Sequence, residues 1–475
     1  MDKRFFRPLL IVLVAALLVL FVAPLLPEWD NGFLPLKRMD IIASLTGGDS
    51  VAVDSLAMEV AEKVATVEEL IPLDAFSAKL QNLKQNKSGK LRIAYFGDSI
   101  IEGDLVTGTL RHDLQREYGG RGVGLVGITS IVNEFRKTIG HTFSRNWESV
   151  SFMSKSGNDL GIMGHTYIPR SWQMVETTVR PEPVKADTSA ADSTITHTPE
   201  PPKKVTVRQN VSGPAWVEYR GSNHPGGMPN FEHIRLFYSH AAAGSEVRVS
   251  YDRTESQRFV LTSGESLQML NLSPQSPISR IRLEFDSHHP IRVYGVSFDA
   301  PSGVYVDNIS IRGYSGMYFS RIPLDILQGF HRLLKYDLVI LQYGENVTSP
   351  KNTNYDFYQK GMVKSVEHIK KAMPGVPILI ISAHDRSIRT AEGLKTSPDI
   401  PILIKAQSDM AKETGSAFWN LFAEMGGLNS MPDWVNASPP LAAKDYTHFS
   451  IAGAKKVGEM LLDVIKKGSL KGEKE

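Results

Sequence analysis

The sequence predicts an α/β protein in which a parallel β-sheet has helices on both faces and an all-β insert divides the chain. Continuous apolar runs, such as LRIAYFG at 91–97 and YDLVILQYG at 336–344, alternate with segments of helical spacing. Between these two groups, short β-rich runs follow one another at intervals of about 8–12 residues, which is typical of a β-sandwich. A length of 475 residues suggests about three units of ~150 residues, or one large domain that carries an insertion.

The α/β part is expected to consist of buried parallel strands, because its apolar runs are continuous rather than alternating. The expected strands are 91–97, 304–313, 336–344, 376–383 and 416–422. Helical segments follow or separate them, near 106–118, 320–334, 355–373, 401–413 and 450–467. Parallel strands with helical connections predict one sheet that is covered on both faces.

The insert is expected to be a jelly-roll-like β-sandwich over 135–302, built from runs such as HIRLFYSH and SRIRLEF. Within it, 176–203 is rich in Pro, Thr, Ser and Ala, which predicts an exposed disordered loop. The remaining divisions are an anchor at 1–30, a spacer and helical linker at 31–88, α/β segments at 89–134 and 303–468, and a tail at 469–475.

The N-terminus carries an apolar segment of 18 residues, 9–26, after the basic residues Lys3, Arg4 and Arg7. As a helix this segment is about 27 Å long, which is close to the hydrocarbon thickness of a bilayer. The preceding charges keep the N-terminus in the cytoplasm. We therefore expect an inner-membrane anchor with an extracytoplasmic body, periplasmic or on the cell surface. A cleaved secretory signal is the alternative interpretation, and it places the body in the same compartment.

The composition excludes several classes of function. With 53 Lys+Arg against 51 Asp+Glu, the formal charge is only +2, and no nucleic-acid partner is expected. The absence of cysteine excludes thiol nucleophiles, disulfides and Cys-bound metals. The histidines of the insert, His233, His240 and His288–His289, have no partners at zinc-site spacing, so no metal is expected.

A candidate nucleophile lies in FGDSIIEG (96–103), where Ser99 follows a buried strand and precedes a helix. Open α/β sheets build their sites at this carboxyl edge. A serine hydroxyl needs a base to take its proton. KDYTHFS (444–450) supplies one, because Asp445 can bond one ring nitrogen of His448 and leave the other nitrogen for Ser99.

Two further residues could hold an oxyanion. Gly313, in SIRGYSG, ends a strand where a backbone N–H can approach a ligand, and Asn346, in QYGENV, could offer a side-chain amide. Each motif is weak alone: GDS recurs at 48–50, and a helix N-cap at Ser99 or turns at the other two positions are structural alternatives. Together, Ser99, Gly313, Asn346 and the pair Asp445–His448 lie at strand ends or in loops. This combination favours an active site.

The motifs GDSIIEG, SIRGYSG, GEN and DYTH resemble the four sequence blocks of the SGNH/GDSL hydrolase family, in the family's order. A β-sandwich between the first and second blocks resembles the peptidoglycan O-acetylesterases of that family. The resemblance implies a flavodoxin-like three-layer α/β/α fold and a site that needs no cofactor. One position departs from the family pattern, because Val347 stands where an acidic residue usually follows the asparagine.

The resemblance also implies a role for each site residue. Ser99 would be the nucleophile, His448 the general base and Asp445 the residue that orients it. The backbone N–H groups of Ser99 and Gly313 and the side chain of Asn346 would form the oxyanion hole. Three neighbours, Asp98, Glu345 and His384, are candidates to line the pocket, with a structural role for His384 an equally good interpretation.

The predicted function is that of a membrane-anchored serine esterase that removes O-acetyl groups from an envelope glycan, peptidoglycan or another polysaccharide, through an acetyl-enzyme. An O-acetyltransferase with the same triad is one alternative. A non-catalytic glycan-binding or scaffold protein is another. Aromatic residues of the insert, Trp216, Tyr219 and Tyr251, could stack on sugar rings, although a place in the sandwich core is the favoured interpretation.

Overall fold

The computed structural model describes residues 73–154, 160–179, 203–252, 254–286 and 291–467. The expected anchor at 1–30, most of the spacer and the tail at 469–475 lie outside the described residues. Among the described residues, no helix combines the length and the apolar character that a membrane crossing requires.

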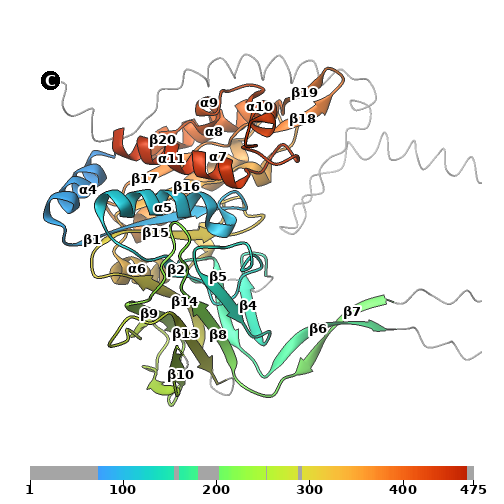
Figure 1. Ribbon diagram of the computed structural model, residues 1–475. Helices are drawn as coiled ribbons and strands as arrows, with labels where there is room; N and C mark the ends of the chain where they lie inside the picture. The colour runs from blue at the N-terminus through green and yellow to red at the C-terminus, as the bar shows by residue number, and fades with distance from the viewer. Residues whose placement is uncertain (1–72, 155–159, 180–202, 253, 287–290, 468–475) are drawn as a thin grey trace, which may run out of the picture.

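One half of the molecule is built on a five-stranded parallel sheet of order β15-β1-β16-β17-β20 (Figure 1). The strands are β1 (Lys90–Gly97), β15 (Gly303–Ser310), β16 (Leu338–Gln342), β17 (Ile378–Ile381) and β20 (Ala417–Trp419). Numbered along the chain within this sheet, the order is 2-1-3-4-5, which is the flavodoxin-like order. The expected α/β architecture with a parallel sheet is therefore confirmed.

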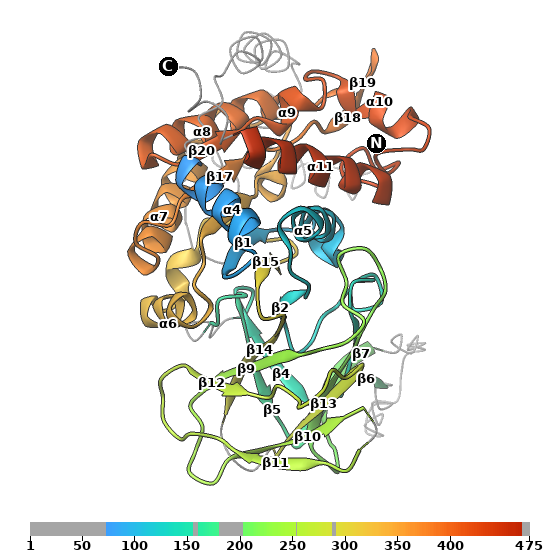
Figure 2. The ribbon, with the colours of Figure 1, turned by 60° about the vertical axis from the view of Figure 1, so that its left-hand side comes forward.

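Helices cover both faces of this sheet because successive strand residues point to opposite sides. Ile93 and Tyr95 of β1 face a core with α4 (Asp74–Asn86), α5 (Leu105–Tyr118) and α11 (Ile451–Lys467). Ala94 and Phe96 face a second core with α6 (Leu324–Leu334), α7 (Asp356–Ala372) and α8 (Asp399–Thr414). The result is three layers (Figure 2).

Short elements complete this half of the molecule and carry the connections around its carboxyl edge. They are the 3₁₀ helices η2 (Glu102–Asp104), η3 (Phe319–Arg321) and η4 (Glu345–Val347), the helices α9 (Leu421–Glu424) and α10 (Ser430–Asn436), and a hairpin of β18 (Ser387–Thr390) and β19 (Gly393–Thr396).

The insert consists of two antiparallel sheets that share one apolar core. The first has the order β11 (Gln257–Val260), β10 (Glu246–Tyr251), β13 (Arg280–Phe285), β8 (Ala215–Arg220) and β3 (Gly140–Phe143). The second has the order β12 (Gln268–Asn271), β9 (His233–Ser239), β14 (Arg292–Asp299), β5 (His165–Pro169) and β4 (Trp147–Ser151), with β2 (Gly124–Val126) also paired to β14. Alternate residues such as Val217, Tyr219 and Ile281 fill the space between the sheets.

The chain enters and leaves the insert through segments that touch one another. A Cβ atom on Gly303 would lie 2.1 Å from the Cα of Gly120, so this approach requires glycine. Strand β2 pairs with the sandwich from residue 124 onward, earlier than the expected start of the insert at 135.

A two-stranded ribbon projects from the sandwich (Figure 1). It pairs β6 (Trp172–Val179) with β7 (Lys203–Asn210). Residues 176–179 and 203, which the sequence places in a disordered loop, are therefore part of strands. Residues 180–202 of that loop lie outside the described residues.

Candidate active site

The candidate site residues gather at the carboxyl edge of the parallel sheet, after three neighbouring strands. Ser99 follows β1, Gly313 follows β15 and Asn346 follows β16. The sheet reverses its direction of winding between β1 and β16, and crevices at such points are where open α/β sheets bind ligands. His448 arrives from the loop before α11.

The structure brings Ser99, His448 and Asp445 together in a line. Ser99 Oγ lies 3.2 Å from His448 Nε2, and His448 Nδ1 lies 2.7 Å from Asp445 Oδ2. The local sequence fixes the carboxylate, because Asp445 Oδ1 accepts hydrogen bonds from the N–H groups of Thr447 and His448, each at 3.0 Å. Asp445 accepts the hydrogen on Nδ1 of His448 and so fixes the orientation of the ring. Nε2 then carries no hydrogen and can act as a base toward Ser99.

The electrostatics of Asp445 keep it ionised. Its partial burial opposes ionisation, but hydrogen bonds from the backbone and ring of His448 and from Thr447 N outweigh this, and the pKa of Asp445 is lowered. The Asp445 and His448 side chains remain 50% and 46% exposed, so water reaches this end of the line.

Two backbone N–H groups at the site have no acceptor within the described part of the chain, those of Ser99 and Gly313. Gly313 adopts a φ of +74°, which favours glycine, and a Cβ atom there would meet nothing within 4 Å. A side chain would therefore have room at Gly313, and the positive φ is what favours glycine there. Unpaired donors of this kind can bind an oxyanion.

The side-chain amide of Asn346 is already engaged. Its Nδ2 donates to Asp98 Oδ2 at 2.8 Å and to the carbonyl oxygen of Tyr314 at 3.2 Å. Asn346 thus joins the loops that follow β1, β15 and β16. The bond to Tyr314 is the longer of the two, and an oxyanion at the site would compete with it for the same hydrogen.

Asp98 supplies the support that the sequence leaves open at Val347. It is fully buried, and its Oδ1 accepts a hydrogen bond from Ile100 N at 3.0 Å while Oδ2 holds Asn346. Burial raises the pKa of Asp98 to about 7 and the nearby Glu345 adds to this, although the two hydrogen bonds act in the opposite direction. Val347 packs against the apolar core instead.

Glu345 and His384 have side chains that are buried next to Asp98. Their side chains are 8% and 1% exposed, and His384 Nδ1 lies 3.2 Å from Glu345 Oε1. Together with Asp98 they line a buried cavity of about 10 Å³. A cavity of this size has room for about one water molecule. These three residues therefore line a small internal cavity and not an open substrate pocket.

Two contacts that support the turn of Ser99 could not be predicted from the sequence. Arg312 forms an ion pair with Glu102, which joins the loop of Gly313 to the turn of Ser99. Asn308 Nδ2 donates to the carbonyl oxygen of Ile101 at 2.7 Å and so supports the same turn. The one available sequence signal was the polar pair Asp307–Asn308 inside the otherwise apolar strand VYVDNISI.

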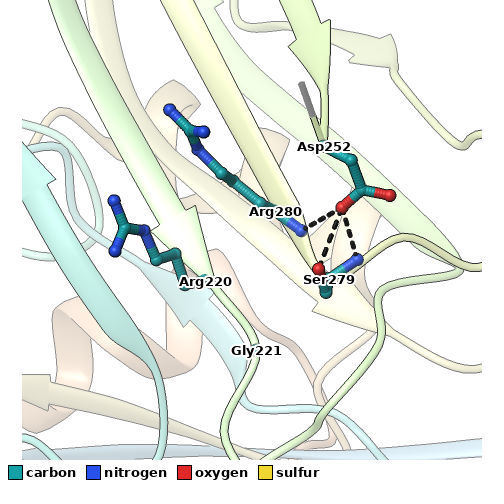
Figure 3. Close-up of a pocket in the computed structure, with 5 residues that line it drawn as sticks. All are labelled: Arg220, Gly221, Asp252, Ser279 and Arg280. Atoms are coloured by element: carbon teal, nitrogen blue, oxygen red, sulfur yellow. Dashed lines mark hydrogen bonds between the residues drawn. The ribbon is translucent and has the colours of Figure 1, made fainter. Parts of the chain in front are cut away.

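A second hollow, of about 540 Å³, lies on the sandwich (Figure 3). Its charged groups are already paired: Arg220 and Arg280 contact Glu218, and Asp252 Oδ1 accepts bonds from the N–H and hydroxyl of Ser279 and from Arg280 N. No histidine lies among its lining residues.

The aromatic residues of the insert have different environments. Tyr219 is fully buried in the sandwich core, as the favoured interpretation expects. Trp216 lies under the guanidinium of Arg282, 3.9 Å from the ring centroid, on the outer face of its sheet.

Comparisons with known proteins reveal similarity of fold. No protein-family model matches the chain, and no curated protein matches its sequence. A solved structure described as a peptidoglycan O-acetylesterase is 21% identical, covers 86% of this chain and 97% of its own, and has a TM-score of 0.63. The two proteins therefore share one fold over most of their length, sandwich included.

Other matches are weaker. A family two carbohydrate esterase from Cellvibrio japonicus is 8% identical, with 69% of this chain and 98% of that chain covered and a TM-score of 0.23. One from Corynascus thermopiles is 11% identical, with 54% and 94% covered and a TM-score of 0.27.

Proposed function

We propose that this protein is a serine esterase that removes O-acetyl groups from a cell-envelope glycan. The observation that carries the proposal is the line of Ser99 Oγ, His448 and Asp445, with contacts of 3.2 and 2.7 Å, at the carboxyl edge of the sheet. An alcohol, an imidazole and a carboxylate in this order are the groups that acyl transfer from an ester requires.

In the first half-reaction, Ser99 Oγ attacks the acetyl carbonyl carbon and its proton passes to His448 Nε2. The carbonyl oxygen becomes an oxyanion, which accepts hydrogen bonds from the N–H groups of Ser99 and Gly313 and from Asn346 Nδ2. The intermediate collapses when the bond from carbon to the sugar oxygen breaks. His448 gives its proton to that oxygen, and the acetyl group stays on Ser99.

In the second half-reaction, water attacks the acetyl-serine. His448 takes a proton from the water and returns it to Ser99 Oγ as acetate leaves. The exposure of His448 and Asp445, about half of each side chain, supports hydrolysis over transfer to a second sugar, because a transferase must keep water from the acyl-enzyme.

The substrate class rests on the shared fold. The protein with the similar structure is described as a peptidoglycan O-acetylesterase, and its coverage includes the sandwich insert. We propose an acetylated glycan of the same kind as the substrate.

The test is hydrolysis of an aryl acetate and of O-acetylated peptidoglycan by the wild-type protein and by Ser99→Ala. The wild type is expected to release acetate, and the variant is expected to lose about a thousandfold or more in kcat. Mass spectrometry after treatment with a fluorophosphonate should place the label on Ser99. A wild type that cleaves no acetyl ester and takes no label would refute the esterase proposal in favour of a non-catalytic protein.

Faster acetyl transfer to a glycan acceptor than to water would instead favour the transferase. The two outcomes are separated by measuring free acetate and acetylated acceptor in the same reaction.

We also propose that residues 9–26 anchor the protein in the inner membrane with the catalytic part outside the cytoplasm. This proposal rests on the apolar sequence and the basic residues before it. The full chain should stay with membranes after alkaline extraction. A variant with Leu17→Arg and Leu18→Arg should be released, and equal retention of both would contradict the anchor.

A further inference from the structure

A buried pair, Glu345 and His384, connects the end of the parallel sheet to the loop that carries His448. Glu345 begins η4 after β16, and His384 follows β17. His384 Nε2 lies 2.6 Å from the carbonyl oxygen of Thr447, the residue immediately before His448. His384 also packs against Phe449, with ring centroids 4.6 Å apart. The imidazole of His384 thus contacts the backbone carbonyl of the residue before the candidate base and the side chain of the residue after it.

The contacts determine where the protons of this pair lie. A carbonyl oxygen can only accept, so Nε2 of His384 must carry a hydrogen and donate it to Thr447. If the ring is neutral, Nδ1 carries a lone pair 3.2 Å from Glu345 Oε1, and neither carboxyl oxygen of Glu345 has a hydrogen-bond partner in the described part of the chain. A buried carboxylate without donors is costly, whereas a protonated Glu345 is neutral and can donate its hydrogen to Nδ1, so the pair is expected to hold one more proton.

We propose that Glu345 and His384 are positioning residues that share one proton and thereby fix the carbonyl of Thr447 and the loop that carries Asp445 and His448. This inference rests on the proposed function. It adds to the triad a buried support that keeps Nε2 of His448 within reach of Ser99, since small displacements of a catalytic group are costly to the rate.

The surroundings of Glu345 determine its pH dependence. The charged and titratable groups that face it are Asp98 after β1, Tyr358 of α7, His384 and Arg386 after β17, Asp399 of α8, and His448 of the C-terminal loop. Burial raises the pKa of Glu345 to about 8 and Arg386 only partly offsets this, while burial lowers the pKa of His384. The shared proton therefore resides on Glu345 below pH 8 and is lost above it.

The experiment measures kcat for acetyl-ester hydrolysis and the rate of fluorophosphonate labelling of Ser99, against pH, in the full-length protein. We expect His384→Ala and Glu345→Ala to lower both rates about tenfold or more with little change in KM. Glu345→Gln keeps a hydrogen-bond donor toward His384, so it should recover part of that loss. We expect wild-type activity to fall above pH 8, and because the amide cannot ionise, Glu345→Gln should lack this fall.

A matched control is Glu392→Gln, the same chemical change on a side chain that is 83% exposed in the β18–β19 hairpin. It should leave the rates and the pH profile unchanged. His384→Gln, which can still reach the Thr447 carbonyl, should retain more activity than His384→Ala.

The inference is overturned if the alanine variants, folded by circular dichroism, react at wild-type rates. It is also overturned if Glu345→Gln is as slow as Glu345→Ala, because the pair would then need an ionised carboxylate, or if the alkaline fall survives in Glu345→Gln. These outcomes all require an active wild type. The esterase proposal itself fails if the wild type neither hydrolyses acetyl esters nor is labelled at Ser99 by the fluorophosphonate.

Discussion

At the scale of single residues, the candidate oxyanion donor Asn346 is held by the carboxylate of Asp98. The sequence alone does not reveal this contact. Asp98 and Asn346 are 248 positions apart, and their 2.8 Å hydrogen bond replaces the support expected from the position of Val347. Asp98 keeps Asn346 in place by accepting from Nδ2. Loss of Asp98 should therefore act through Asn346 rather than independently of it.

We predict that Asp98→Ala lowers kcat about tenfold and that Asn346→Ala lowers it about a hundredfold, since one lost oxyanion donor costs about 10²–10³ in kcat. The double variant should be no slower than Asn346→Ala alone, because residues that act through one contact are not additive. The measurement is a double-mutant cycle on kcat for an aryl acetate. Additive losses would mean that Asp98 acts by another route.

Protonation of the buried carboxyls Glu345 and Asp98 makes the free energy of unfolding depend on pH. The folded protein holds the Glu345 proton up to about pH 8, whereas the pKa of an unperturbed Glu is 4.5. Between these values the folded state binds more protons than the unfolded chain, so the free energy of unfolding falls as the pH rises.

We therefore predict that the free energy of unfolding of the wild type decreases, relative to that of Glu345→Gln, by about 2–4 kcal/mol between pH 5 and pH 9. Urea denaturation of both proteins across this range tests it. Asp98, whose pKa is raised to about 7 mainly by burial, contributes with the same sign in both proteins, and only the smaller part that comes from Glu345 is lost in Glu345→Gln. Parallel curves would contradict the prediction.

At the scale of elements, the turn that carries Ser99 is packed tightly against its own strand. A Cβ atom on Gly97, the last residue of β1, would lie 2.8 Å from Cγ1 and Cδ1 of Ile101 and 3.1 Å from the carbonyl oxygen of Gln342 in β16. The glycine of the GDS motif is thus required by space at the junction of strand and turn.

We predict that Gly97→Ala destabilises the protein by about 1–3 kcal/mol, as overpacking does, and slows Ser99 labelling because Ile101 and the turn must move. Adding Ile101→Val removes one of the crowded atoms and should restore part of the stability. Denaturation midpoints and labelling rates are the measurements. A neutral Gly97→Ala, or no recovery in the double variant, would show that the turn accommodates the methyl group without strain.

The elements that could be predicted from the sequence are those with a continuous pattern. The apolar runs of β1 and β16 locate the sheet, and motif order with strand context locates Ser99, Asn346, Asp445 and His448. The expected strand 416–422 is shorter, ending at Trp419, because Asn420 accepts a hydrogen bond from Ala423 N and begins α9. Contacts such as His384 with the Thr447 carbonyl involve a backbone atom, which leaves no residue-type signal in the sequence.

At the scale of the whole molecule, a buried ionic cluster joins the parallel sheet to the sandwich. Arg92 of β1 donates from Nε and Nη2 to Asp307 of β15, each at 2.8 Å, and from Nη1 to Asp299 of β14 at 3.0 Å. The side chains are 2% exposed for Arg92 and fully buried for both aspartates. Arg235 of β9 also pairs with Asp299. Burial opposes ionisation of Asp299, but Arg92 and Arg235 outweigh it and lower its pKa.

This cluster links the insert to the α/β part through buried ion pairs. We predict that Arg92→Met lowers the free energy of unfolding by about 3–5 kcal/mol, because it leaves buried carboxylates without their main partner. Arg92→Met combined with Asp307→Asn should recover part of that loss, since one uncompensated charge is removed as well. The measurement is equilibrium denaturation followed separately by tryptophan fluorescence and by circular dichroism.

The matched control is Lys405→Met, which removes the cation of an exposed pair between Lys405 and Asp409 on α8 and should change stability by less than about 1 kcal/mol. If the two parts depend on the cluster for their association, the two probes that coincide in the wild type should separate in Arg92→Met, as coupling between the sandwich and the sheet weakens. An Arg92→Met protein that unfolds at the wild-type midpoint would mean that apolar contacts alone, such as Phe237 of β9 against Phe330 of α6 at 5.3 Å, hold the two parts together.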